Sequence, residues 1–596
     1  MLCGCTDDEP GREPALLIAP FLAGQFFCEE SQDNPAIDSD ETAAWYCGEL
    51  GSTGARRIAT ALDAIGPAAS PSGRYLLGYT LIVPLFRYFR KQDGRWQFQT
   101  AIVAQNLATI AAVGRPVVLY LSSNHFIDSG RELCLELAQD PANLMANAAG
   151  PLQPDRYFDS ALIPWTLVDQ TAPVNVLRRE AFEKVLTAIA ALPEPARALI
   201  KAISFLGETH HLFPDFFAGP RIDCPLSSGT DYAPAAVADF RAWLAQRYGR
   251  VEDLNAFLDA DFVSFDAIDP PTKNIISEHL DSFLEHIDAY AAGTVSVVGW
   301  VHDAMGRPLQ VDVYLDGKRT GRAHYGLSRT DVTDALSEIA DPNVGFRFNL
   351  DYREAAVGIH TLDVVVEVAG APPVRLARQS LVIVNRRQDP SSVVACADDS
   401  LPGIGSCMGL SGALDAPRHL TAVFYNPLAQ LWLQYRNGAV RDYLETFAAI
   451  AVRHGVPVER LFSHQVSPAL VGSWHADLLA ADASKQPSPY HRPGTTLYGG
   501  AAFGAAFVTM KAELAWGPYG VSELHPMVRL RPDQYQAMFE MHRTQGALFV
   551  APYFLYVGPR RLLGAADSHG RFQIAPDNSR LGSDLFYQAI QDAMRQ

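Results

Sequence analysis

Short apolar runs alternate with amphipathic stretches along most of the chain, which is the pattern expected of an α/β protein. The amphipathic stretches predict helices, and the clearest of them cover residues 98–113, 235–248, 440–454, 502–515 and 532–545. The apolar runs predict eight strands, at residues 15–20, 75–84, 117–122, 202–207, 420–425, 461–464, 517–522 and 548–554. Eight strands with helices between them fit a (β/α)8 or TIM barrel, which takes about 250 residues and more with insertions. A doubly wound open sheet is the alternative, but no GxGxxG motif follows a strand to support it.

One segment departs from this alternation. From about residue 294 to residue 387 the helical period disappears, and period-2 strands are expected at 295–301, 311–316, 345–351 and 360–368. Turns such as Asp316-Gly317 separate them. The pattern predicts a small β-sandwich of immunoglobulin size inserted into the barrel. We therefore expect three parts: residues 1–293 and 388–596 form the catalytic barrel, and residues 294–387 form the insert.

Length and charge narrow the class of function. A chain of 596 residues is too long for one simple core, and its 48% hydrophobic and 19% charged content is that of a folded protein. A net charge of -18 argues against a nucleic-acid partner, because phosphate binding needs clustered Lys and Arg. A neutral carbohydrate substrate is compatible with this charge. No run of about 18 apolar residues is present, so no transmembrane segment is expected.

The amino-terminal residues and the cysteines bear on location. Leu2-Cys3-Gly4-Cys5 has the form of a bacterial lipoprotein cleavage box, with Cys5 as a candidate lipid anchor, although almost nothing precedes it. The match is either the start of a shortened sequence or chance. Cys28 with Cys47, and Cys396 with Cys407, are spaced as short disulfide loops; buried free thiols are the alternative. These features favour a periplasmic or secreted protein. No Cys or His spacing predicts a metal site.

Two glutamates follow predicted strands directly. Barrel active sites lie at the carboxyl ends of the strands, and Glu208 follows the fourth predicted strand while Glu523 follows the seventh. Cleavage of a glycosidic bond needs such a pair, with one carboxyl group to protonate the leaving oxygen and one carboxylate facing the anomeric carbon. Either glutamate alone is more readily explained as a surface or ion-paired loop residue. The pair, on opposite sides of one barrel mouth, favours catalysis.

Glutamates on strands four and seven resemble the arrangement in the large clan of retaining (β/α)8 glycoside hydrolases. Within that clan, the phrase FRAWLAQRYG at 240–249, continued by VEDLNAF at 251–257, resembles the helix after strand four in family-42 β-galactosidases. The resemblance implies a retaining β-glycoside hydrolase of oligo- or polysaccharides that needs no cofactor. Glu208 would be its general acid/base and Glu523 its nucleophile.

The chain departs from the clan at two points. Gly207 stands where most members have an Asn, and the phrase VSELHP at 521–526 matches only loosely, so galactose is not implied. The missing Asn supports the alternative of a non-catalytic carbohydrate-binding or scaffold protein on a glycosidase-like barrel. The insert, with phrases such as VDVYLDG at 311–317 and YGLSRTDV at 325–332, resembles immunoglobulin-like modules of bacterial surface and carbohydrate-active proteins. Related barrels commonly form dimers or trimers, so an oligomer is a further expectation.

Several other side chains at strand ends are candidates for substrate contacts. They lie after the third, fourth, fifth and sixth predicted strands and comprise Asn124, His125, His210, Tyr425, Asn426 and His464. Aromatic residues that could carry the face of a sugar ring are Trp474, Trp516, Tyr519 and Tyr553. For each aromatic residue, ordinary packing is the alternative.

Overall fold

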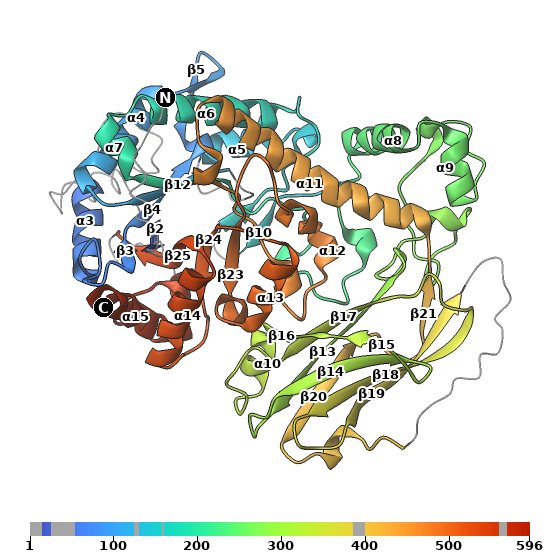
Figure 1. Ribbon diagram of the computed structural model, residues 1–596. Helices are drawn as coiled ribbons and strands as arrows, with labels where there is room; N and C mark the ends of the chain where they lie inside the picture. The colour runs from blue at the N-terminus through green and yellow to red at the C-terminus, as the bar shows by residue number, and fades with distance from the viewer. Residues whose placement is uncertain are drawn as a thin grey trace.

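The computed structural model describes residues 15–24, 54–123, 125, 130–157, 160–384, 400–558 and 569–596. Its centre is a sheet of eight parallel strands that pair in the order in which they occur along the chain (Figure 1). The first two strands are each broken into two short pieces. In order, the strands are β1 and β2 (Leu16–Ile18, Phe21–Ala23), β3 and β4 (Tyr75–Leu77, Tyr79–Pro84), β7 (Val117–Ser122), β12 (Ile200–Leu206), β22 (Leu461–Phe462), β23 (Gly494–Tyr498), β24 (Tyr519–His525) and β25 (Ala547–Tyr556).

The sheet closes on itself. The last strand, β25, pairs in parallel with β24 on one side and with β1 and β2 on the other. Between β22 and β23, parallel bridges join Phe462 to Arg492 and Gln465 to Thr495. This closed parallel sheet has the topology of a TIM-like barrel, and the predicted α/β class is confirmed.

Helices cover the outside of the sheet. Their apolar faces pack against the strands in the largest hydrophobic core, as Ile58, Leu62 and Ile65 of the first helix illustrate. The strands are buried on both faces, which explains their nearly continuous apolar runs. The covering helices are α3 (Gly54–Ile65), α4 (Thr100–Val113), α6 (Pro173–Ala190), α7 (Glu194–Leu199), α11 (Pro427–Arg453), α13 (Ala505–Glu513), α14 (Pro532–Thr544) and α15 (Ser583–Arg595).

Smaller elements lie in the connections. A hairpin of β5 (Phe89–Gln92) and β6 (Arg95–Phe98) precedes α4. The connection after β7 contains α5 (Arg131–Leu137) and two short antiparallel pairs, β8 with β9 (Ala146–Asn147, Gly150–Pro151) and β10 with β11 (Asp155–Tyr157, Ser160–Leu162). The connection after β22 contains α12 (Ala476–Leu479).

A long excursion separates β12 from α11. Its first α-helices are α8 (Pro234–Tyr248) and α9 (Val251–Leu258), which pack against the amino-terminal part of α11 in a core of their own. Two further sheets follow. The four-stranded sheet has the order β16 (His324–Leu327), β17 (Gly345–Asp351), β13 (Thr294–Asp303) and β20 (Leu410–Ala416). The five-stranded sheet has the order β15 (Lys318–Arg322), β14 (Leu309–Leu315), β18 (Gly358–Val368), β19 (Val374–Val384) and β21 (Thr421–Phe424).

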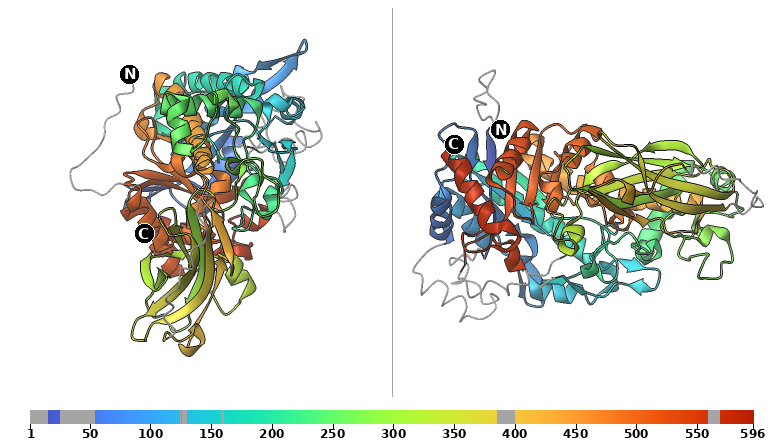
Figure 2. Two further views of the ribbon diagram at one scale, coloured as in Figure 1. Left: turned by 90° about the vertical axis from the view of Figure 1, so that its right-hand side faces the viewer. Right: turned by 90° about the horizontal axis from the view of Figure 1, so that it is seen from below.

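The two sheets lie together beside the barrel, as Figures 1 and 2 show. A separate hydrophobic core, with Val297, Val313 and Phe346 fully buried, joins them. The short helix α10 (Thr330–Ala335) connects β16 to β17. Strands β20 and β21, which follow residue 387, complete the sheets. The domain boundaries and the immunoglobulin-like character of this unit stay predictions.

One predicted barrel strand is wrong. Residues 420–425 do not enter the barrel, because β21 pairs in parallel with the end of β19 in the five-stranded sheet. The fifth barrel strand is instead β22, and the sixth is β23, which the hydrophobic pattern did not predict. A short apolar run carries no information about which sheet it joins. Because one strand was added and one was missed, Glu523 still belongs to the seventh strand; it lies inside β24 rather than after it.

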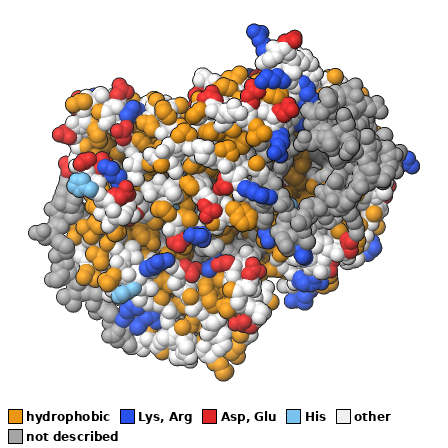
Figure 3. Space-filling model, turned by 180° about the vertical axis from the view of Figure 1, so that it is seen from behind, with side chains coloured by type: hydrophobic (Ala, Val, Ile, Leu, Met, Phe, Trp, Pro, Cys, Tyr) orange, Lys and Arg blue, Asp and Glu red, His pale blue; other side chains and the backbone are white. Residues whose placement is uncertain are grey.

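Acidic and basic side chains are interspersed on the face of the molecule drawn in Figure 3. Within the described ranges, no helix is long and apolar enough to cross a membrane. Cys407 has a free thiol, and Cys396, its expected partner, lies outside the described residues. Cys5, Cys28 and Cys47 lie outside the described residues.

Asn426 is a structural residue at the start of α11. Its Oδ1 accepts a hydrogen bond from the backbone N–H of Leu428 (3.0 Å). Its Nδ2 donates to the carbonyls of Leu284 (3.0 Å) and His286 (2.7 Å), and the side chain is fully buried. It therefore caps the helix and fastens it to the segment at residues 284–286, which precedes the two-sheet unit.

We predict that Asn426→Ala destabilises the protein by on the order of 2 kcal/mol, because the helix cap is lost and two buried carbonyls lose their donor. Urea unfolding would measure the change. Gln430→Ala, which removes a single partly buried contact with Tyr425 just before the helix, is the control and should cost less than about 1 kcal/mol. Equal costs for the two variants would contradict this role.

Candidate active site

Glu208 and Glu523 lie at the carboxyl end of the barrel. Glu208 is the second residue after β12, and Glu523 is the fifth residue of β24, so they come from the fourth and seventh strands. Both side chains keep partial access to solvent, although the residues on either side of each are mostly buried. Each carboxyl group therefore faces an opening rather than the core.

Strand β23 joins the two carboxyl groups. Thr496 Oγ1 donates a hydrogen bond to Glu208 Oε1 (2.9 Å), and Tyr498 Oη donates one to Glu523 Oε2 (2.6 Å). Residues two positions apart on a strand point to the same side, so both donors face the same space. Thr496 and Tyr498 are functional residues that the sequence analysis missed together with their strand. The β-branched and aromatic residues of Gly-Thr-Thr-Leu-Tyr at 494–498 were the available signal.

Glu523 has a second polar neighbour. His464 Nε2 lies 3.2 Å from Glu523 Oε1, and the side chain of His464 is only 1% exposed. The imidazole stacks on the ring of Tyr120 from β7, with centroids 4.3 Å apart and an interplanar angle of 29°. Tyr498 and His464 thus hold one oxygen each and fix the direction of the Glu523 carboxylate. The structure places His464 against Glu523. Its predicted contact with a substrate stays a prediction.

Glu208 has a strongly shifted acidity. Burial, with the charge of Glu523 as the next cause, raises the pKa of Glu208 to about 8, and the hydrogen bond from Thr496 acts in the opposite direction. Glu208 is therefore protonated at neutral pH. Burial and the charge of Glu523 also raise the pKa of Tyr498 well above its usual value, which keeps its hydroxyl available as a donor.

The backbone that carries Glu208 is clamped from the neighbouring strand. The buried side chain of Gln465 accepts a hydrogen bond from the N–H of Thr209 (3.1 Å) and donates one to its carbonyl (2.9 Å). Gly207 has φ 102°, in the region that only glycine adopts readily. A side chain at this position would be strained.

Two histidines form a buried wall near Glu208. The rings of His125, after β7, and His210, after β12, have centroids 5.0 Å apart. Burial lowers the pKa of His210 to about 4 and that of His125 well below its usual value, so both rings are neutral at pH 7. Among the described residues, neither ring nitrogen of His125 has a hydrogen-bond partner. Asn124 lies outside the described residues.

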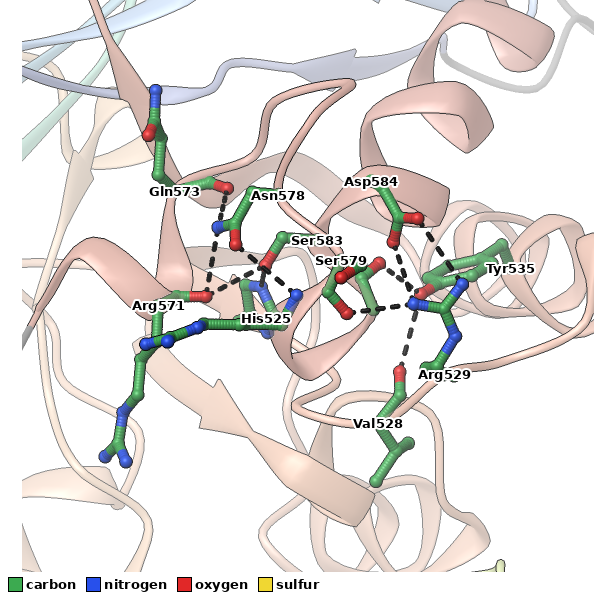
Figure 4. A network of polar contacts seen from close by, with 12 residues as sticks. His525, Val528, Arg529, Tyr535, Arg571, Gln573, Asn578, Ser579, Ser583 and Asp584 are labelled. Carbon is green, nitrogen blue, oxygen red and sulfur yellow. Dashed lines mark hydrogen bonds and ion pairs between the residues drawn. The ribbon is translucent and has the colours of Figure 1, made fainter. Parts of the chain in front are cut away.

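The end of β24 is tied to the segment after β25 by the network in Figure 4. His525 lies 3.1 Å from Ser583 Oγ through its Nε2, and Ser583 Oγ donates to the carbonyl of Arg571 (3.1 Å). Burial lowers the pKa of His525 to about 3. His525 therefore supports the segment at 571–583 and does not contact Glu523 directly.

Tyr157, on β10, is a further residue beside the pair that the sequence analysis missed. Burial raises its pKa to about 12, and the negative charges of Glu208 and Glu523 contribute in the same direction. The positive charge of Arg571 acts against them. Both residues lie in long connections whose course the hydrophobic pattern does not predict.

Three of the expected substrate-contact residues lie away from the carboxyl groups. Trp516 precedes β24, at the opposite end of the barrel, where its indole N–H donates to the carbonyl of Lys485 (2.7 Å). Tyr425 and Asn426 follow β21 rather than a barrel strand; Tyr425 donates its hydroxyl hydrogen to Gln430 (2.7 Å). The prediction that these two residues line the barrel mouth fails with the strand that carried it.

Of the other aromatic candidates, two lie away from the carboxyl groups and one lies near them. Tyr519 is fully buried and its hydroxyl lies 2.9 Å from His542. Trp474 packs partly buried against the core around α8 and α11. Tyr553 instead belongs to a cluster at the carboxyl ends of the strands, with its ring 5.9 Å from that of Tyr498. Of the described residues, no group of three or more His, Cys, Asp or Glu side chains is arranged to hold a metal ion.

No protein-family model matches the chain, and no curated protein matches its sequence. Solved structures do match. The catalytic domain of β-amylase from Paenibacillus polymyxa aligns with a TM-score of 0.45 and 10% identity, over 98% of this chain and 100% of that one. A β-galactosidase from Rahnella sp. R3 aligns with a TM-score of 0.26 and 14% identity, over 45% of this chain and 30% of that one. Scores this low leave the function to be inferred from the site itself.

The raised pKa of Glu208 predicts an unusual dependence of stability on pH. The folded protein keeps this proton between the ordinary value near 4.5 and about 8, whereas the unfolded chain releases it. Rising pH across that window therefore favours unfolding. We expect Glu208→Gln to have nearly the wild-type Tm at pH 5 and a higher Tm than wild type at pH 8, measured by calorimetry.

Glu540→Gln is the matched control, because a hydrogen bond from Arg543 and its charge lower the pKa of Glu540. Its effect has the opposite sign: the variant loses stability at neutral pH and differs little from wild type in acid. If Glu208→Gln gains nothing relative to wild type between pH 5 and pH 8, Glu208 is ionised in the neutral protein.

Proposed function

We propose that the protein is a glycoside hydrolase that cleaves β-glycosidic bonds of an oligo- or polysaccharide with retention of configuration. One observation carries the proposal: two carboxyl groups share the barrel mouth, one protonated at neutral pH and the other held by two polar neighbours. This division of labour is what the two-carboxylate mechanism requires. The resemblance of the chain to the clan of retaining barrel glycosidases agrees with it.

In this mechanism Glu208 donates its proton to the glycosidic oxygen while Glu523 attacks the anomeric carbon. The C–O bond to the leaving group breaks, the leaving group departs as an alcohol, and a covalent glycosyl-enzyme ester forms. Esterification removes the negative charge of Glu523, which is one of the two causes that raise the pKa of Glu208. The pKa of Glu208 therefore falls in the intermediate, so Glu208, having given up its proton, stays ionised and can accept a proton from the water that hydrolyses the ester.

The neighbouring residues have supporting roles in the proposal. Tyr498 and His464 aim the Glu523 carboxylate, and Gln465 fixes the backbone next to Glu208. The neutral imidazole of His125 offers one donor and one acceptor, which suits a sugar hydroxyl. The reaction needs no cofactor. A periplasmic or secreted location, as the amino-terminal residues suggest, suits a polysaccharide substrate.

Substitution of the two glutamates tests the proposal with a panel of aryl β-glycosides. We expect Glu523→Gln to lower kcat by on the order of 10⁴-fold or more, since the covalent intermediate cannot form. Glu208→Gln should cost about 10²- to 10⁴-fold with poor leaving groups and much less with dinitrophenyl glycosides, which leave without a proton. Glu540→Gln should keep the wild-type rate.

Azide and NMR separate the roles. Azide should rescue Glu208→Ala to give a β-glycosyl azide and Glu523→Ala to give the α-anomer, and NMR of the wild-type reaction should show the β-product first. An α-product formed first would exclude retention. Binding of sugars without hydrolysis of any substrate would favour the non-catalytic carbohydrate-binding alternative.

Tyr498→Phe tests the orientation of the nucleophile. The variant loses a hydrogen bond to a charged group, worth about 1.5–3 kcal/mol, so we expect kcat to fall about 10- to 100-fold with a smaller change in KM. Tyr519→Phe also removes one buried hydroxyl, but from a contact with His542. Steady-state kinetics should show little change for Tyr519→Phe; equal losses in the two variants would indicate a general effect on folding.

A further inference from the structure

Three aromatic rings meet from two connections, the one that contains β10 and the one that follows Glu208. The ring of Tyr157, on β10, contacts the rings of Phe216 and Phe217 edge-on, with centroids 5.5 Å and 6.1 Å away. Phe216 and Phe217 belong to the turn η3 (Phe216–Ala218) in the excursion after β12. Phe217 is 56% exposed, which is a large exposure for a phenylalanine.

The support beneath Phe217 is rigid. Asp155 Oδ2 accepts a hydrogen bond from the backbone N–H of Phe216 (3.2 Å), which fastens η3 to β10. The ring of Phe216 lies almost parallel to that of His210, at 5.6 Å and 8°, and also packs on Phe213 at 5.2 Å. An apolar ring is thus held in place with much of its surface toward solvent.

These rings lie on the side of the barrel mouth that carries Glu208. Phe216 stacks on His210, which is two residues after Glu208 on the same connection, so the cluster extends outward from the Glu208 side of the mouth. Burial is the main cause of the raised pKa of Tyr157. After burial, the charge of Glu208 raises this pKa more than the charge of Glu523 does. In the proposed reaction, the group that protonates the glycosidic oxygen stands on the side of the departing sugar.

We propose that Phe217, supported by Tyr157 and Phe216, is a platform for a sugar ring of the leaving group, so that the enzyme prefers substrates with sugar units beyond the cleaved bond. This inference rests on the proposed function. The apolar C–H face of a pyranose can cover the exposed ring, while its hydroxyl groups stay in water. The substrate is then a β-linked oligosaccharide rather than a glycoside of a small alcohol.

The test compares substrates with and without a sugar in the leaving group. We would measure kcat/KM of the wild type and of Phe217→Ala for β-linked oligosaccharides of two to five units and for a β-glycosyl fluoride. The variant should lose about 3- to 10-fold on the longer oligosaccharides, the value of one aromatic contact, and keep its rate on the fluoride. Phe217→Trp retains an aromatic ring and should keep the wild-type preference for long substrates.

Phe257→Ala is the control, since Phe257 on α9 is also exposed (46%) and contacts the ring of Tyr248 away from the carboxyl groups. It should leave every rate unchanged. An equal loss of Phe217→Ala on oligosaccharides and fluoride, or no loss on either, would overturn the inference.

A binding measurement separates this inference from the proposed function. If the wild type hydrolyses neither kind of substrate, the proposed function fails, and calorimetric titration of the same oligosaccharides then decides the platform. Weaker binding to Phe217→Ala than to wild type supports a sugar site at Phe217. Equal binding, or no binding to either protein, overturns it.

Discussion

Two carboxyl groups at one barrel mouth cannot both be ionised without mutual repulsion, and the local structure is arranged around this constraint. The proton stays on Glu208, where burial adds to the charge of Glu523. The oxygens of Glu523 face a hydroxyl and an imidazole. A single strand, β23, contacts both groups, so the position of one carboxyl group is mechanically linked to that of the other.

The barrel strands place the two glutamates, and side chains from other strands orient them. Strand ends place Glu208 and Glu523, but their orientation comes from side chains on other strands: Thr496 and Tyr498 on β23, and Gln465 beyond β22. Such cross-strand support explains how the long excursion can begin immediately after Glu208 without disturbing it. The segment from Gly207 to Thr209 is anchored before the chain leaves the barrel.

The sequence predicts the barrel and both glutamates because a strand end followed by a carboxylate is a local pattern. It predicts the strands at 295–301 and 345–351 equally well, since their period of two is also local. It does not predict that residues 420–425 pair with β19, because that pairing depends on contacts distant in the sequence. Tyr157 escaped notice for the same reason: only the folded connection brings it near Glu208. The prediction that Trp516 contacts substrate failed because an aromatic residue next to a strand gives no indication of which end of the barrel it occupies.

The excursion between β12 and α11 also bears on the order in which we expect the chain to fold. Strand β12 must pair with β22, and the register joins Ile203 to Leu461, residues separated by the whole of the two-sheet unit. That unit has its own hydrophobic core, so it can collapse while the barrel is still open. Once compact, it brings the two ends of the excursion together. The loop that must close when the barrel forms is then effectively shorter, and closing it costs less chain entropy. The folded unit thereby holds the two parts of the barrel close to each other, and we expect the fourth and fifth barrel strands to join only after it has folded.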